Sequence, residues 1–310
     1  MVTPTEQLPT PTTLDLYTQP ATMTSLARHA DLLQGLPHDV AELAKVLQGL
    51  VVHEHLTELY GFKLSDKRRQ TVHIRPAEQF LERIHAEDGR PLTEPRTPEN
   101  RVAGCCRHFT VLFVALLRHQ GVPARARCGF GGYLSTETFE DHWVAEYFNA
   151  DHGRWILVDA QIDDVLRGGL PNGFDATDVS RDEFVIAGDA WASCRAGDAD
   201  PSSFGFSHLN QGGYWWIAGN LLRDVAALNN MEMLPWDVWG AMPGVDQPID
   251  DDQVRLFDRL AALTRSPDAG VDELSSAYHD DERVRVPRTV INAIRLRNEE
   301  ITSSRTRSDR

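Results

Sequence analysis

The segment over residues 105–120 constrains the fold of this chain more than any other. Its apolar side chains recur at helical spacing, and Gly121 and Pro123 end the helix that this spacing predicts. Three runs of strand-like composition come next, each bounded by turn-forming residues: 124–134, 142–149 and 155–159. A helix followed directly by an antiparallel run of strands predicts an α+β centre.

Further helices are predicted on both sides of this centre, because apolar residues recur at spacings of three and four. They cover residues 23–60 (with a new start at Pro37), 76–85, 214–228, 251–264 and 287–301. A proline-rich loop is expected over residues 88–100, and residues 168–213 are expected to form long connections with short elements.

We find neither an internal repeat nor a separating linker, and therefore expect a single domain over residues 23–301. Its core is expected at about residues 76–165, with helical additions before and after. Residues 1–22 are rich in Thr and Pro and have too little apolar surface to offset the entropy of ordering, so a flexible arm is predicted. Residues 302–310 are predicted to be a disordered tail.

The composition excludes several classes of protein. Of 310 residues, 41% are hydrophobic and 25% charged, as in ordinary globular chains. The formal charge of −15, without any basic stripe, argues against nucleic acid and membrane surfaces as partners. No apolar run is long enough to span a bilayer, and the N-terminus does not resemble a signal peptide, so a cytoplasmic location is expected. The four cysteines are then expected to be thiols.

The central helix begins with Gly104-Cys105-Cys106-Arg107-His108. A thiol in the first turn of a helix lies beside unpaired backbone N–H groups, which favour the thiolate and also stabilise an oxyanion. A nucleophilic thiol needs an imidazole to take its proton, and the imidazole needs a third group to orient it. His142 opens the second strand and Asp159 ends the third, so neighbouring strands are expected to hold both side chains beside the helix N-terminus.

Four blocks of this sequence resemble the transglutaminase-like cysteine superfamily in order and spacing. They are Gly104-x-Cys106-Arg107, Leu116-Leu117-Arg118-x-x-Gly121-Val122-Pro123-Ala124-Arg125, His142-Trp143-Val144-x-Glu146 and Trp155-x-x-x-Asp159. The resemblance covers about residues 98–165 and implies a papain-like core, in which Cys106 matches the nucleophile, His142 the base and Asp159 the orienting acid. The chain departs from the pattern at Asp159-Ala160-Gln161, where many members have Asp-Pro.

The rest of the chain is similar to stand-alone bacterial members of this superfamily. The resemblance implies cofactor-independent acyl chemistry through a Cys106 thioester. The reaction would be amide hydrolysis or acyl transfer, on an amide- or acyl-containing small molecule or peptide, with an amine as acceptor in the second case. One alternative is a member that has lost its activity and acts as a binding or scaffold protein. Another is a redox sensor that uses Cys105 and Cys106 as a dithiol.

Cys106 is preferred over Cys105 as the nucleophile, because adjacent helical residues point about 100° apart and the family pattern has the nucleophile directly before Arg107. Cys105 is then expected to be a small buried residue. Two residues beside the base are candidate substrate-binding groups. Trp143 is expected either to wall the site or to lie in the core. Asp141 is expected either to bind a cationic group or to be solvated like Glu140.

No cofactor or metal is expected. His53-Glu54-His55 lacks zinc-ligand spacing and is interpreted as a helix end, where the two imidazoles would face different sides. Gly129-x-Gly131-Gly132 lies in or beside a strand and lacks the lysine of a phosphate-binding loop. A second oxyanion donor is expected upstream of Cys106, where Asn100 and His85 are candidates.

Overall fold

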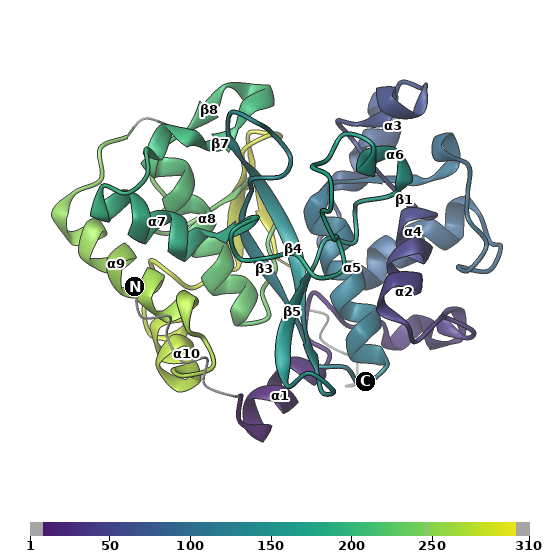
Figure 1. The fold of residues 1–310 in the computed structure, drawn as a ribbon, viewed down its shortest axis with the longest axis horizontal. Helices are drawn as coiled ribbons and strands as arrows, with labels where there is room; N and C mark the ends of the chain where they lie inside the picture. The colour runs from purple at the N-terminus through teal and green to yellow at the C-terminus, as the bar shows by residue number, and fades with distance from the viewer. Residues whose placement is uncertain (1–8, 246, 302–310) are drawn as a thin grey trace.

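A mixed six-stranded sheet lies at the centre of the structure, a computed structural model that describes residues 9–245 and 247–301. Its strands are β3 (Ala124–Gly131), β4 (Phe139–Asn149), β5 (Arg154–Val158), β6 (Phe184–Ile186), β7 (Phe204–Phe206) and β8 (Gln211–Gly212). β4 pairs antiparallel with β3 and β5 and parallel with β7. The sheet separates two groups of helices (Figure 1), which confirms the predicted α+β fold.

The strand register brings the ends of β4 and β5 together. Gly129 of β3 is opposite His142 of β4, and Ala145 of β4 is opposite Val158 of β5. Because the strands are antiparallel, moving forward along β5 from Val158 to Asp159 corresponds to moving back along β4 from Ala145 toward His142. Side chains in such a diagonal relation across two strands are within reach of each other when they are long.

Helix α5 (Cys106–His119) packs against β4 and β3 and is buried along most of its length. Two short parallel strands, β1 (Val51–His53) and β2 (Val102–Gly104), lead up to its first turn. Helices α2 (Val40–Gln48) and α4 (Ala77–Glu87) pack against α5 on the same side of the sheet (Figure 1).

Helices α7 (Ala187–Ala196), α8 (Tyr214–Leu228) and α9 (Asp251–Arg265) lie on the other side of the sheet, with α10 (Val271–His279) beyond them. Buried ion pairs join this side to β3. Arg127 donates to the carboxylate of Asp224 on α8 at 3.0 and 2.8 Å. Arg125 pairs with Asp268 at 2.7 Å and with Glu146 of β4 at 2.5 Å.

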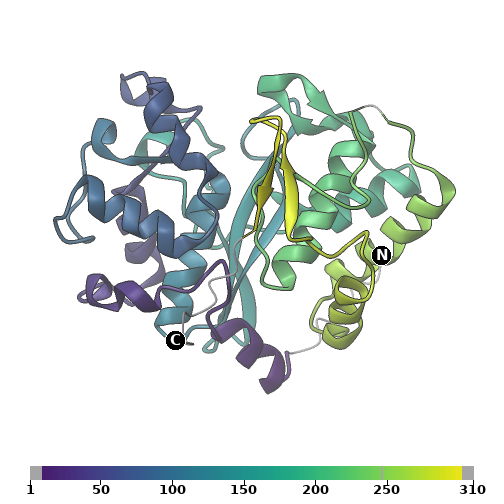
Figure 2. The same ribbon diagram turned by 180° about the vertical axis from the view of Figure 1, so that it is seen from behind.

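The predicted helix over residues 287–301 is wrong. This segment forms the hairpin β10 (Thr289–Asn292) and β11 (Arg297–Glu300), which pairs with β9 (Asp237–Val238) and is seen in yellow from behind in Figure 2. Burial along β10 alternates with a period of two, as in a strand. The segment has few apolar residues, and their spacing fits a helix as well as a strand. The helical spacing was therefore misleading here.

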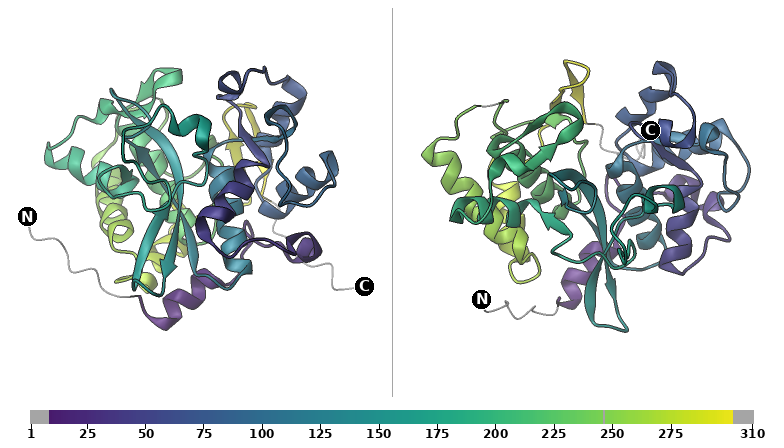
Figure 3. Two further views of the ribbon diagram at one scale, coloured as in Figure 1. Left: turned by 45° about the vertical axis from the view of Figure 1, so that its right-hand side comes forward. Right: turned by 45° about the horizontal axis from the view of Figure 1, so that its top comes forward.

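The predicted flexible arm is wrong for the part of it that is described. Helix α1 (Pro11–Thr18), capped by Thr10, packs against α5 and β3 (Figure 3). Tyr17 is buried and donates a hydrogen bond to the carbonyl of Leu228 at 3.0 Å. The buried side chain of Tyr17 thus holds this segment against the domain, although its Thr- and Pro-rich composition is typical of a flexible chain. Residues 1–8, like the predicted tail at 302–310, lie outside the described residues.

The helical prediction for residues 23–60 is correct only in part. The segment contains the 3-10 helix η1 (Ala27–Leu33), α2, the strand β1 and the 3-10 helix η2 (Thr57–Tyr60). The predictions at 76–85, 105–120, 214–228 and 251–264 correspond to α4, α5, α8 and α9. None of the helices in the described ranges is long and apolar enough to cross a bilayer.

Candidate active site

Two adjacent thiols lie at the N-terminus of α5. Cys105 is the extended residue directly before the helix and Cys106 is its first residue. Both are buried, and all four cysteines of the chain are free thiols, as predicted. The first-turn N–H groups of a helix lack intrahelical acceptors, so a negative charge on sulfur or on a bound oxygen is stabilised at this position.

His142 and Asp159 form a buried pair across β4 and the end of β5. The Nε2 of His142 lies 2.8 Å from Oδ2 of Asp159. Since a carboxylate only accepts hydrogen bonds, Nε2 carries the proton in this pair, and Nδ1 holds the free electron pair of the neutral ring. Nδ1 is therefore the atom of His142 that can act as a base.

Asp159 is held by two further donors. The hydroxyl of Tyr133 donates to Oδ2 at 2.7 Å and the backbone N–H of Gln161 donates to Oδ1 at 3.0 Å. Burial, with the adjacent Asp159 charge, raises the pKa of Tyr133 well above its usual value, so the phenol stays protonated as a donor. The sequence analysis missed Tyr133, because nothing in its local pattern shows that its loop returns to the end of β5.

The Cys106 thiol lies beside the strand that carries His142. This thiol accepts a hydrogen bond from the backbone of Trp143, and Trp143 directly follows His142 in β4. The structure thus brings together, around the first turn of α5, the elements that carry Cys106, His142 and Asp159.

Cys105 faces a different imidazole. Nδ1 of His108 lies 3.1 Å from the backbone nitrogen of Cys105 and 3.2 Å from its Sγ, while Nε2 lies 3.0 Å from the carbonyl of Ile74. Because the Ile74 carbonyl can only accept, Nε2 carries the proton and Nδ1 accepts from Cys105. The expectation of a buried Cys105 is met, but its thiol also has a polar partner.

The two thiols are hydrogen-bonded and titrate as a pair. Burial raises the pKa of Cys105, but the hydrogen bond from Cys106 and the nearby His108 outweigh it and bring this pKa well below the usual value. The same hydrogen bond, together with burial, raises the pKa of Cys106 well above the usual value. In such a coupled pair, the loss of one proton opposes the loss of the second.

Neither candidate substrate-binding residue is free to bind substrate. Trp143 is 1% exposed and lies in the hydrophobic core, so its interpretation as a wall of the site is wrong. Asp141 accepts hydrogen bonds from Trp216 at 3.1 Å and Asn220 at 3.0 Å, both on α8. It is neither solvated nor open to a cationic group. Glu140 is also buried and accepts from the backbone of Ser207.

The structure gives no support to the two candidates for a second oxyanion donor. Asn100 is exposed and its amide donates to Thr97 at 3.0 Å. His85 is exposed near the C-terminal end of α4. The interpretation of His53-Glu54-His55 as a helix end is also wrong, since His53 ends the strand β1. Within the described residues, no group of three or more His, Cys, Asp or Glu side chains is placed to hold a metal ion.

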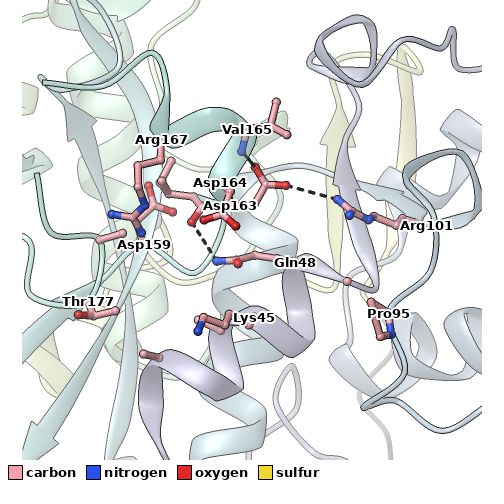
Figure 4. Close-up of a pocket in the computed structure, with 15 residues that line it drawn as sticks. Lys45, Gln48, Pro95, Arg101, Asp159, Asp163, Asp164, Val165, Arg167 and Thr177 are labelled. Carbon is pink, nitrogen blue, oxygen red and sulfur yellow. Dashed lines mark hydrogen bonds and ion pairs between the residues drawn. The ribbon is translucent and has the colours of Figure 1, made fainter. Parts of the chain in front are cut away.

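A cavity of about 470 Å³ borders Asp159 (Figure 4). Gln48 of α2 crosses it to donate to the carbonyl of Ile162 at 3.0 Å. Arg101 pairs with Asp163 at 3.4 Å. Charged side chains of both signs line the walls, so the cavity carries no single sign of charge that would select a ligand.

Comparison with known proteins finds one family match, in the central part of the chain. Residues 65–160 match the family model described as the transglutaminase-like superfamily. Among solved structures, a candidate cysteine protease from Cytophaga hutchinsonii is similar, with 18% sequence identity and a TM-score of 0.30. The match covers 60% of this chain and 53% of that one, so the chain spans about half the length of that protein. No curated protein matches.

Proposed function

We propose, on the premise that residues 65–160 are a transglutaminase-like superfamily domain, that this protein carries out acyl chemistry through a thioester on Cys106. The acyl donor would be an amide- or acyl-containing small molecule or peptide. Transfer of the acyl group to water gives hydrolysis, and transfer to an amine gives a new amide. The proposal needs no metal or cofactor.

In the proposed reaction, Nδ1 of His142 takes the proton of the Cys106 thiol as the sulfur adds to the substrate carbonyl. His142 then protonates the leaving amine, and the thioester remains on Cys106. Water or an amine, deprotonated by His142, attacks the thioester and releases the thiol. Asp159 keeps the proton on Nε2 of His142 throughout, which leaves Nδ1 as the reacting nitrogen.

One observation carries this proposal: the 2.8 Å contact between Nε2 of His142 and Asp159, with Tyr133 bound to the same carboxylate oxygen. A histidine that merely packs in the core can be satisfied by one hydrogen bond. It does not require a buried carboxylate that accepts three hydrogen bonds, as Asp159 does from His142, Tyr133 and Gln161. Burying a carboxylate has a large desolvation cost. The arrangement therefore favours a side chain that is kept in one tautomer for proton transfer.

The first test is the rate of iodoacetamide alkylation against pH, with the modified residue located by mass spectrometry. The resting pKa of Cys106 is raised, but His142 should take the thiol proton as the sulfur attacks. The wild type should therefore be alkylated at Cys106 faster than an ordinary thiol near neutral pH, and His142→Ala should slow this reaction. Cys106→Ala should remove the adduct, while Cys105→Ala serves as the matched control and keeps it.

Alkylation with an ordinary thiol profile, unaffected by His142→Ala, would contradict the proposal and favour a binding protein without activity. Alkylation that depends on Cys105 and not on His142 would favour the redox dithiol.

A further inference from the structure

His53 lies next to the segment that leads into the candidate nucleophile. It is the last residue of β1 and is in register with Gly104, the last residue of β2. The backbone N–H of Glu54 donates to the carbonyl of Gly104 at 2.9 Å, which holds the two chains together at this point. Cys106 follows two residues after Gly104. His53 therefore lies upstream of the nucleophile in the sequence and beside the segment that leads into it.

The imidazole of His53 has one nitrogen engaged and one free. Nδ1 accepts the backbone N–H of His55 at 3.3 Å, so the proton of the neutral ring is on Nε2. Among the described residues, Nε2 has no hydrogen-bond acceptor, although the side chain is half-buried. An N–H donor that no acceptor of the protein occupies, on a half-buried side chain, is available to a ligand.

The surroundings of His53 keep it neutral. Burial is the main cause that lowers its pKa to about 3; Cys105 opposes this shift, and the imidazoles of His55, His142 and His108 contribute to it. Cys105, His108 and the candidate base His142 are thus near enough for their charges to act on the His53 imidazole. At any pH where His142 can act as a base, His53 is a neutral donor and does not compete for the proton of the thiol.

We infer that the Nε2–H of His53 is the second donor of the oxyanion hole, with the backbone N–H of Cys106 as the first. This inference rests on the proposed function. As the sulfur–carbon bond forms, the π electrons of the carbonyl move to its oxygen, and this oxygen accepts both hydrogen bonds. The thiol proton goes to His142. When the carbonyl re-forms, the carbon–nitrogen bond breaks and the amine leaves with the proton from His142. His53 gains and loses no proton.

Two reactions of the same thiol separate this role from others. Alkylation by iodoacetamide displaces iodide at a saturated carbon and forms no oxyanion, whereas acylation by p-nitrophenyl acetate passes through one. His53→Ala should slow acylation of the full-length protein by about 10²-fold, the usual effect of losing one oxyanion donor. It should leave the rate and pH profile of alkylation unchanged.

Matched variants sharpen the test. His53→Gln places an amide N–H near the position of Nε2 and should restore most of the acylation rate, while His53→Asn places it near Nδ1 and should not. His55→Ala keeps the backbone N–H that binds His53 and is the control for a neighbouring imidazole. A measured alkylation profile equal to that of the wild type shows that each variant has a folded site.

Acylation unchanged in His53→Ala would overturn the inference, and so would alkylation and acylation slowed to the same degree, because His53 would then act on the thiol. A wild type that is alkylated but not acylated would also overturn it, while the activated thiol of the proposed function would stand. Absence of alkylation at Cys106 in the wild type would overturn the proposed function itself.

Discussion

Cys105 and Cys106 are neighbours whose thiols share a hydrogen bond, and this pairing sets their ionisation at the scale of single residues. The ionised form of Cys105 raises the pKa of Cys106. The attacking thiol is thus protonated in the resting state. Its activation therefore requires a base that accepts its proton when substrate binds. His142 can do this, whereas the N-terminus of a helix stabilises negative charge but accepts no proton.

Replacing Cys105 with Ala should therefore lower the pKa of Cys106, because the hydrogen bond and the negative charge that raise it are both removed. The pH profile of Cys106 alkylation should move to lower pH. Acyl chemistry should stay within about tenfold of the wild type, since thiol nucleophilicity falls only moderately as the pKa falls. A profile that moves to higher pH would show that Cys105 activates Cys106. Cys128→Ala, at a buried thiol outside the pair, is the control.

At the scale of elements, the pairing of β3 with β6 depends on one glycine. A Cβ added at Gly129 would lie 2.3 Å from the carbonyl oxygen of Val185 on β6, a backbone atom that cannot move aside alone. Gly129 is also opposite His142 on β4. The absence of a side chain thus lets three strands approach at the position of the candidate base.

Gly129→Ala should separate β6 from β3 and destabilise the protein by about 1–3 kcal/mol, the usual effect of overpacking a core. Denaturant unfolding followed by tryptophan fluorescence measures this. Gly168→Ala is the matched control, because its added Cβ would meet Val165 at an ordinary contact distance of 3.5 Å. Equal midpoints for both variants would mean that β6 is not held against β3 in solution.

At the scale of the whole molecule, buried ion pairs connect the sheet to the C-terminal helices. Glu146 of β4 is fully buried and receives Arg125, Arg127 and Arg181. Burial raises the pKa of Glu146, but these three arginines outweigh it and hold that pKa well below the usual value. The carboxylate therefore contributes stability above the pKa of an unfolded glutamate, about 4.5, and this contribution is lost as the pH falls.

Glu146→Gln should destabilise the protein by about 3 kcal/mol at pH 7, because it removes one of the two carboxylates that each of the buried Arg125 and Arg127 is paired with. The difference from the wild type should shrink as the pH falls below about 4.5. The free energy of unfolding in urea, measured from pH 7 to pH 3, tests both statements. Glu42→Gln removes an exposed pair with Lys45 and should change stability by about 0.5 kcal/mol or less. A constant difference across this pH range would contradict the role of the Glu146 charge.

The sequence alone determined the central helix, the three strands after it and the order in which Cys106, His142 and Asp159 occur, because helical and strand spacing are local properties. The closeness of His142 and Asp159 was also expected, since antiparallel neighbours bring strand ends together. The domain boundaries and the catalytic roles of these residues remain predictions.

Only the tertiary structure decided which side chains are free to react. Trp143 and Asp141 stand beside the base in the sequence, yet the core and α8 enclose them. His53 belongs to a motif that had no assigned role, and the pairing of β1 with β2 brings it to the nucleophile. Burial and hydrogen-bond partners depend on segments that are distant along the chain, and local patterns do not encode which of those segments will meet.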